Sequence, residues 1–278
     1  MNYRHSFHAG NFADLVKHAL VLWLVRSRQA TGPVAVLDTH AGGGLYDLTG
    51  EATRSREAEA GVARLMTSGD LPAPLEALAA EVRAVNPGLK PGPIESGTIR
   101  WYPGSPVLVA RLLRPDDRYL GFELNETVLP LLAQSLSPFP EADGQAADGY
   151  DAAIAAAGQA RGPLILIDPP FERPDDYVRA ADTALALVRA DPAATVAIWT
   201  PLKDLETFDG FLRRLNGAGP VLVAEARLRP LTDPMKMNGC AMVVVNPPEG
   251  ADAVAAEICG WVAETLGDKG AKAEVWRL

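Results

Sequence analysis

An apolar run that ends in an acid and two prolines is the feature of this sequence that most constrains its fold. Residues 164–172 read Leu-Ile-Leu-Ile-Asp-Pro-Pro-Phe-Glu. A short continuous run of branched apolar residues is typical of a strand buried in a parallel sheet. Proline extends neither a central strand nor a helix interior, so the chain must leave the sheet in a rigid loop. We therefore predict an α/β fold with Asp168 at the carboxyl end of a strand, where open α/β sheets bind ligands.

The loop after this strand has the chemistry of a site for a planar group that carries an amino substituent. Asp168 offers carboxylate oxygens, Pro169 offers a carbonyl oxygen and no N–H, and Phe171 offers a flat apolar ring. These acceptors beside a ring suit a nucleobase with an exocyclic NH₂. The alternative interpretation is a strand followed by a proline-rich turn without a function of its own.

Predicted strands and helices alternate along most of the chain, which indicates a largely parallel sheet with helices on both faces. The expected strands are 34–37, 118–123, 163–167, 195–199, 221–229, 240–246 and 273–278. The expected helices are 11–28, 105–114, 174–190, 202–215 and 251–266. Residues 47–100 break the alternation with helical segments at 56–67 and 73–85. We predict that they form a small helical subdomain inserted into a main domain of 1–46 and 101–278.

Composition argues against several classes of function. The 278 residues contain no apolar run long enough to span a membrane, and we expect no signal peptide at the N-terminus. Two cysteines without a disulfide pattern favour a reducing compartment, so we expect a cytoplasmic protein. The net charge of −9 argues against non-specific nucleic-acid binding. Residues 1–30 carry four basic residues against one acid, however, and are the best candidate for a local contact.

A second candidate site follows the first predicted strand, in the glycine-rich loop Asp38-Thr-His-Ala-Gly-Gly-Gly44. Glycines let the backbone approach a ligand closely, and Glu123 at the end of the next strand could accept hydrogen bonds from two ribose hydroxyls. The glycine spacing fits neither Gly-x-Gly-x-x-Gly nor a P-loop, which disfavours a pyrophosphate site. A tight turn stays an alternative for the loop. Asp148, followed by Gly149, fits either an acceptor for an adenine amino group or a helix cap.

All four histidines, His5, His8, His18 and His40, lie in the first 40 residues. No cysteine or acid completes a recognised zinc-ligand spacing with them, so a zinc site is the least favoured interpretation. Two others stay open. The histidines either bridge backbone groups structurally, or His18 and His40 line a ligand pocket beside the glycine-rich loop.

Five blocks of the sequence match one known family in the same order. They are Tyr3-Arg-His-Ser-Phe-His-Ala-Gly-Asn11, Lys17-His18, Leu37-Asp-Thr-His-Ala-Gly42, Tyr102-Pro-Gly-Ser-Pro106 and Ile167-Asp-Pro-Pro-Phe-Glu172. On these residues the chain resembles the RlmJ family of bacterial 23S ribosomal RNA adenine-N6 methyltransferases, from its first residues to Val245-Asn-Pro-Pro248. The resemblance implies a Rossmann-like methyltransferase fold with a small helical subdomain. It also implies S-adenosylmethionine as methyl donor, S-adenosylhomocysteine as product, no metal, 23S ribosomal RNA as partner, no membrane association, and a monomer without an obligate protein partner.

The resemblance also implies roles for individual residues. Asp168 is the expected catalytic acid, with Pro169 and Phe171 in the same motif. The implied cofactor contacts are Lys17, His18, His40, Ser105, Glu123, Asp148, Gly149 and Asp168. Tyr3 and Arg4 are the implied contacts with the RNA. The chain departs from relatives in having Phe171 in place of Tyr, which loses only a hydroxyl, and Gly43 in place of Ala.

The mechanism that follows uses hydrogen bonds from the adenine amino group to Asp168 and to the Pro169 carbonyl. These bonds favour the pyramidal nitrogen of the transition state, while Phe171 stacks on the base. The adenosine must be unpaired or flipped out to reach the site. Two rival functions remain: a DNA adenine methyltransferase, for which the insertion is small and not notably basic, and a non-catalytic nucleotide-binding module, against which the intact motif argues.

Overall fold

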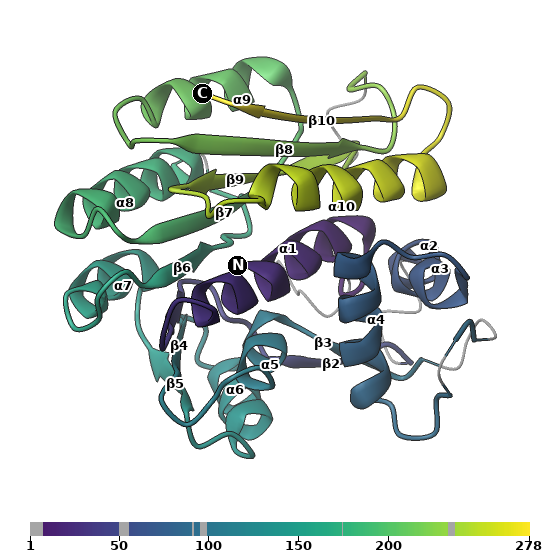
Figure 1. Ribbon diagram of the computed structural model, residues 1–278, viewed down its shortest axis with the longest axis horizontal. Coiled ribbons are helices and arrows are strands. Elements are labelled where there is room, and N and C mark those ends of the chain that lie inside the picture. The colour runs from purple at the N-terminus through teal and green to yellow at the C-terminus, as the bar shows by residue number, and fades with distance from the viewer. Residues whose placement is uncertain (1–7, 50–55, 91, 95–98, 174, 233–236) are drawn as a thin grey trace.

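The fold is built on a mixed sheet, here described from a computed structural model that covers residues 8–49, 56–90, 92–94, 99–173, 175–232 and 237–278. Over these ranges, eight strands lie in the order β10-β8-β9-β7-β6-β1-β4-β5 (Figure 1). Their bounds are β1 Ala35–Asp38, β4 Arg118–Glu123, β5 Ala142–Ala146, β6 Leu164–Ile167, β7 Thr195–Pro201, β8 Val221–Arg227, β9 Gly239–Val245 and β10 Lys272–Arg277. The five strands from β5 to β7 pair in parallel, and β9, β8 and β10 pair antiparallel.

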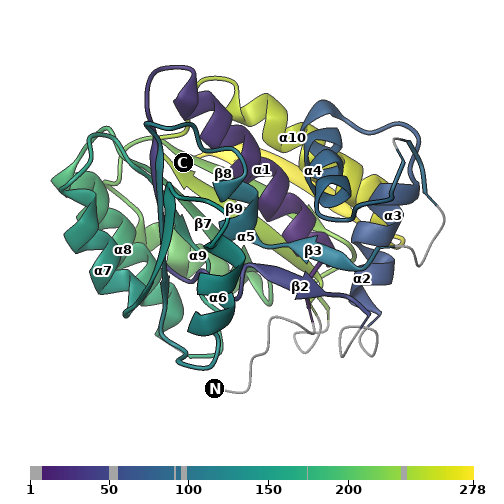
Figure 2. The same ribbon diagram turned by 90° about the horizontal axis from the view of Figure 1, so that it is seen from below.

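Helices cover both faces of this sheet, as the alternation predicts (Figure 2). The helices of the main sheet are α1 Phe12–Gln29, α5 Ser105–Ala110, α6 Leu129–Leu136, α7 Gly149–Ala157, α8 Asp176–Ala190, α9 Leu205–Arg214 and α10 Ala251–Leu266. All four residues of β6 are buried because alternate side chains enter different apolar cores. Leu164 and Leu166 belong to the core that contains α1 and α10, whereas Ile165 and Ile167 belong to the core that contains α7, α8 and α9. Burial on both faces explains the continuous apolar run in the sequence.

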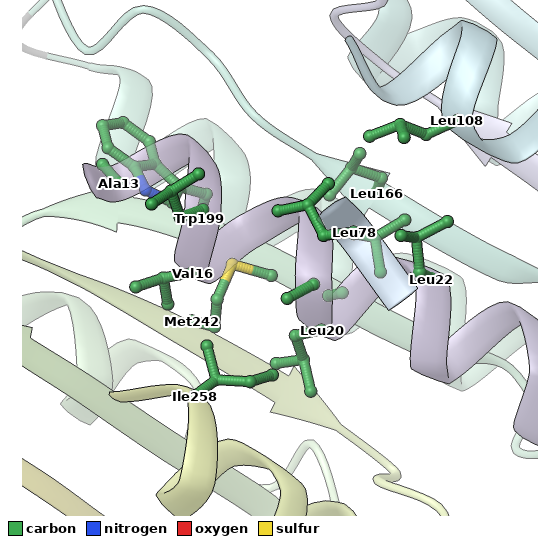
Figure 3. Packing of buried hydrophobic residues seen from close by; sticks show 14 of the residues in the cluster. Ala13, Val16, Leu20, Leu22, Leu78, Leu108, Leu166, Trp199, Met242 and Ile258 are labelled. Carbon is green, nitrogen blue, oxygen red and sulfur yellow. The ribbon is translucent and has the colours of Figure 1, made fainter. Parts of the chain in front are cut away.

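Helix α1 begins at the edge of the sheet where the parallel strands end. The Asn11 side chain caps it by accepting a hydrogen bond from Asp14 N at 3.0 Å. Most of the helix is buried, with Ala13, Val16 and Leu20 packed near Trp199 of β7 and Met242 of β9 (Figure 3). The first turns of α1 therefore lie across the sheet, close to the end of β6.

The segment between β1 and β4 contains a short separate ribbon and further helices. Strands β2 Leu45–Asp47 and β3 Trp101–Pro103 pair antiparallel in a separate ribbon. Between them lie α2 Glu57–Ala60, α3 Val62–Thr67 and α4 Ala73–Ala84. Helices α3 and α4 bury their apolar side chains in the same core as α1. The predicted boundary of an inserted subdomain at 47–100 stays a prediction.

Several expected elements differ from the observed ones. The expected helix 105–114 ends at Ala110, and the expected helix 56–67 is divided at Gly61 because Val62 N turns to donate a hydrogen bond to Gly10 O at 2.8 Å. Helix α7 is the helix expected after Asp148, whereas strands β2, β3 and β5 and helix α6 have no counterpart in the prediction. Strand β5 has the sequence Ala-Asp-Gly-Gln-Ala, which lacks an apolar pattern and becomes a strand only through its pairing with β4. In the described ranges, no helix combines the length and apolar character needed to cross a membrane.

Candidate active site

A cavity of about 740 Å³ opens at the carboxyl ends of β1, β4 and β6. The chain leaves β1 and β6 toward opposite faces of the sheet, so the cavity lies at the switch point where open α/β folds bind ligands. Nine of the residues predicted for the site line it: Lys17, His18, His40, Ser105, Glu123, Asp148, Gly149, Asp168 and Pro169. Tyr3 and Arg4 lie outside the described residues.

Asp168 sits at the end of β6, as predicted, and forms an ion pair with Lys17. Lys17 Nζ donates to Asp168 Oδ2 at 2.6 Å and lies 2.9 Å from Asp14 Oδ1. The three side chains are 4%, 13% and 5% exposed, respectively. Burial by itself lowers the pKa of Lys17, but the charges of Asp14 and Asp168 outweigh it and raise that pKa well above its ordinary value. Lys17 is therefore a buried ammonium held between two carboxylates.

Glu123 at the end of β4 joins the glycine-rich loop to the next strand. Its Oε2 accepts a hydrogen bond from Gly42 N at 3.0 Å, and its Oε1 accepts one from Asn125 N at 2.7 Å. Gly42 has φ of +66°, and a side chain there would collide with the Tyr46 hydroxyl. Each carboxylate oxygen keeps a lone pair for a further donor in the cavity.

Asp38, at the end of β1, is the first residue of the predicted glycine-rich loop but does not line the cavity. It is fully buried and accepts hydrogen bonds from Ser105 Oγ at 2.7 Å, Tyr119 Oη at 3.1 Å and His40 N at 3.2 Å. Burial raises the pKa of Asp38 to about 6. Asp38 thus fixes the positions of Ser105 and of the loop that carries His40.

Asp148 is a helix cap and a cavity residue at the same time, so the two sequence interpretations are compatible. Its Oδ1 accepts from Tyr150 N at 3.2 Å at the start of α7, and its Oδ2 accepts from Arg179 Nη2 at 2.8 Å. The Arg179 guanidinium lies 4.3 Å from the centroid of the Tyr150 ring. A side chain at Gly149 would collide with the carbonyl of Thr39, so this close approach requires glycine. Nothing in the sequence pattern singles out Arg179, because its pairing depends on how α8 packs against α7.

His18 and His40 both line the cavity, which is one of the two interpretations left open for these residues. His18 Nδ1 hydrogen-bonds the Tyr102 hydroxyl at 2.8 Å, and His40 Nδ1 hydrogen-bonds Thr39 Oγ1 at 2.7 Å. Burial lowers the pKa of His40 to about 4, so its ring is neutral at physiological pH. Within the described ranges, no group of three or more His, Cys, Asp and Glu side chains could hold a metal ion.

The structure does not bring Phe171 into the cavity. Phe171 has φ of +50° and is 4% exposed, and its ring centroid lies 4.5 Å from that of Tyr177 and 5.9 Å from that of Trp199. Lys203 Nζ donates to the Phe171 carbonyl at 3.2 Å. Trp199 lines the cavity instead. Stacking of a base on Phe171 stays a prediction, because in this conformation the ring does not line the cavity.

Comparison with known proteins agrees with the predicted family. A family model described as ribosomal RNA large subunit methyltransferase D, RlmJ, matches residues 31–278. Ribosomal RNA large subunit methyltransferase J of Escherichia coli K12 is 35% identical over 253 residues, which cover 89% of this chain and 88% of that protein. The protein of the same name from Haemophilus influenzae is 32% identical over 275 residues, covering 97% and 95%.

A solved structure supports the fold separately. The crystal structure of a Legionella pneumophila protein superimposes on this chain with a TM-score of 0.82 at 23% sequence identity. The superposition covers 97% of this chain and 98% of the Legionella chain. The predicted Rossmann-like methyltransferase fold and the predicted family are therefore confirmed. On its full-length similarity to these methyltransferases, the chain belongs to the RlmJ family of ribosomal RNA large subunit methyltransferases.

Proposed function

We propose that this protein transfers a methyl group from S-adenosylmethionine to the N6 amino group of an adenosine in 23S ribosomal RNA. The observation that carries the proposal is Asp168 at the end of β6, lining the cavity next to Pro169 with one carboxylate oxygen held by Lys17. The names of the two curated relatives identify large-subunit ribosomal RNA as the substrate of those proteins. The acceptor-rich motif adds a preference for an amino group on a nucleobase.

The cavity residues fit the proposed cofactor. A volume of about 740 Å³ is within the range of pockets for ligands of this size. The free lone pairs of Glu123 suit two ribose hydroxyls, and Asp148 suits an adenine amino group. The residues proposed to hold the cofactor are Lys17, His18, His40, Ser105, Glu123, Asp148, Gly149 and Asp168. When bound, S-adenosylmethionine supplies an electrophilic methyl group on a cationic sulfur, whose carbon–sulfur electron pair stays on sulfur as the methyl group leaves.

Asp168 and Pro169 prepare the nucleophile. The lone pair of the adenine amino nitrogen is delocalised into the ring, which makes that nitrogen a poor nucleophile. Hydrogen bonds from its two N–H groups to Asp168 Oδ1 and to the Pro169 carbonyl would strengthen as the nitrogen becomes pyramidal, so they stabilise the transition state. Lys17 holds Oδ2 and keeps the Asp168 carboxylate oriented. Asp168 then takes the proton that the nitrogen loses once its bond to the methyl carbon has formed. A carboxylate is too weak a base to remove that proton beforehand.

The RNA is proposed to reach this site as an unpaired or flipped adenosine. Asn11 lines the cavity, so the described chain begins beside it. Tyr3 and Arg4, eight and seven positions before Asn11 in the sequence, are the residues proposed to contact the RNA. We further propose that the protein acts in the cytoplasm as a monomer without a metal, and that 47–100 forms an inserted subdomain. Helices α2 to α4 carry Glu57, Glu59, Glu76 and Glu81 against Arg64 and Arg83, which is not the charge of a DNA-recognition region.

The decisive experiment is mass-spectrometric mapping of N6-methyladenosine in 23S ribosomal RNA from cells with and without this gene. One methylated adenosine should vanish in the deletion strain. Wild-type protein should restore it, whereas Asp168→Ala should not, although it folds. Purified enzyme with labelled S-adenosylmethionine should methylate 23S RNA in preference to adenine-containing DNA. Preference for DNA would establish the rival substrate, and a protein that binds cofactor without ever forming product would establish a non-catalytic module.

A further inference from the structure

Asp14 holds a position that its place in the sequence does not explain. It lies in the first turn of α1, where an acid is favoured by the positive end of the helix dipole. That effect accounts for an exposed acid, but the Asp14 side chain is only 5% exposed and lines the cavity. Its Oδ2 accepts a hydrogen bond from Gly10 N at 2.9 Å, and its Oδ1 lies 2.9 Å from Lys17 Nζ. A buried carboxylate is retained only where its partners repay its loss of hydration.

Asp14 and Asp168 reach Lys17 from different parts of the fold. Asp14 lies one turn before Lys17 on α1, and Asp168 comes from the loop after β6. The ammonium has three N–H donors, and these two carboxylates occupy two of them, at 2.9 and 2.6 Å. Two carboxylates and one ammonium leave this buried group with a net charge of −1.

We propose that Asp14 is a positioning residue for methyl transfer, which holds Lys17 between two carboxylates so that the cluster keeps one negative charge beside the target amino nitrogen. The inference rests on the proposed function. As the methyl group arrives, positive charge moves to that nitrogen, and a nearby net negative charge stabilises it. Without Asp14, Lys17 would neutralise Asp168 one to one, and this stabilisation would fall.

Other titratable groups of the described residues also face the cluster, but none of them hydrogen-bonds or ion-pairs with Lys17. They are His8, His18, Asp38, His40, Tyr46, Tyr102 and Cys240. Burial raises the pKa of Tyr46, Tyr102 and Cys240 and lowers the pKa of His40, so these four are neutral near pH 7. His18 Nε2 lies 4.0 Å from Asp14 Oδ1, and Asp38 is committed to Ser105 and Tyr119. Asp14 is the acid that contacts Lys17 opposite Asp168.

The test compares Asp14→Asn with Asp252→Asn. Asp252 is a matched control because it also lies in the first turn of a helix and pairs with a basic residue, Arg277, yet it is exposed and does not line the cavity. Asp14→Asn should lower kcat by about 10- to 100-fold, with KM for RNA and calorimetric affinity for S-adenosylhomocysteine changed less than about threefold. The alkaline limb of its pH–rate profile should move to lower pH, because Lys17 loses the charge that most opposes its desolvation. Asp252→Asn should match the wild type in all of these.

A second variant guards against a purely structural effect. Asp14→Glu keeps the charge but displaces the carboxylate by one methylene, so it should keep the alkaline limb of the wild type while kcat falls. A structural role alone predicts that both variants lose thermal stability and recover wild-type kcat and pH profile at a temperature where they are folded, and that result would overturn the proposal. If the wild type itself methylates no adenosine, the proposed function fails. An active wild type beside an equally active Asp14→Asn overturns only the role of Asp14.

Discussion

Lys17 and Asp168 are 151 positions apart in sequence, and their side chains meet at 2.6 Å inside the cavity. The contact ties the first helix of the chain to the loop after β6. It also gives Asp168, the proposed catalytic acid, a fixed partner, which a surface-exposed carboxylate at the end of a strand would lack.

Lys17→Met should abolish measurable methylation and also destabilise the protein. Its removal leaves Asp14 and Asp168 as buried carboxylates that repel each other, and breaking a buried pair costs about 3–5 kcal/mol. Urea denaturation should show this fall in the free energy of unfolding, and single-turnover assays should show the loss of rate. Lys272→Met is the control, since Lys272 is exposed and pairs with Glu274 away from the cavity. A stable, active Lys17→Met protein would contradict the role of the pair.

Arg179→Met should weaken cofactor binding while leaving the chemical step intact. Arg179 orients the Asp148 carboxylate through a partly exposed ion pair, and such pairs are worth roughly 1 kcal/mol or less. We expect the calorimetric Kd of S-adenosylhomocysteine to rise about two- to fivefold, with kcat at saturating cofactor within twofold. Arg214→Met removes the comparable pair with Asp182, on the same helix as Arg179 but outside the cavity, and should leave Kd unchanged. Equal Kd values for the two variants would show that Arg179 does not position Asp148 for cofactor binding.

His40 should make the protein less stable in mild acid. Burial lowers its pKa from 6.5 to about 4, so between these values the unfolded chain binds a proton that the folded protein excludes. Stability attributable to His40 is therefore lost as the pH falls from about 6.5 to about 4. His40→Gln should flatten this part of the stability curve by roughly 1–3 kcal/mol, measured by urea denaturation over a series of pH values.

His8 supplies a control of opposite sign. Its hydrogen bond to Glu57, at 2.8 Å, raises the pKa of His8 in the folded protein. His8 therefore contributes stability that is fully present below pH 6.5 and is lost as the pH rises through its folded-state pKa. The stability curves of His8→Gln and His40→Gln should deviate from the wild type in opposite directions. Two curves parallel to the wild type would show that neither histidine is linked to folding.

Asp117→Asn should destabilise the fold without touching the site. Asp117 is fully buried and accepts hydrogen bonds from Val34 N at 2.8 Å, Gln29 Nε2 at 2.8 Å and the Arg114 guanidinium at 3.0 Å. These bonds outweigh the effect of burial and lower its pKa, so the stability they add is lost as the pH falls below about 4. We expect a loss of about 2–3 kcal/mol at pH 7, seen in thermal and urea unfolding. The exposed neighbour Asp116, changed to Asn, should cost little, and cofactor affinity should be unchanged in both.

The prediction of the fold succeeded where the information is local. Leu164–Ile167 is apolar at every position because both of its faces are buried, and the two prolines after Asp168 end the strand, so its position at the sheet edge follows from neighbouring residues alone. Strand β5 and the β2–β3 ribbon were not predictable in this way. Their residues do not alternate between apolar and polar. β5 is a strand only because β4 supplies its hydrogen-bond partners, and β2 and β3 are strands only because they pair with one another.

The sequence by itself determined the α/β class, the family and the residue types gathered at the end of the sheet, since each depends on short motifs and their order. The tertiary structure alone decided which of those residues touch. In the sequence, Asp14 looks like an ordinary acid in the first turn of a helix. Its contact with the Lys17–Asp168 pair exists only because α1 packs across the sheet. The Phe171 ring is of a kind that can stack on a base. Its backbone is left-handed, however, and the ring packs against Tyr177 in the core instead. Contacts between residues far apart in sequence depend on how whole elements pack, and no local pattern encodes that packing.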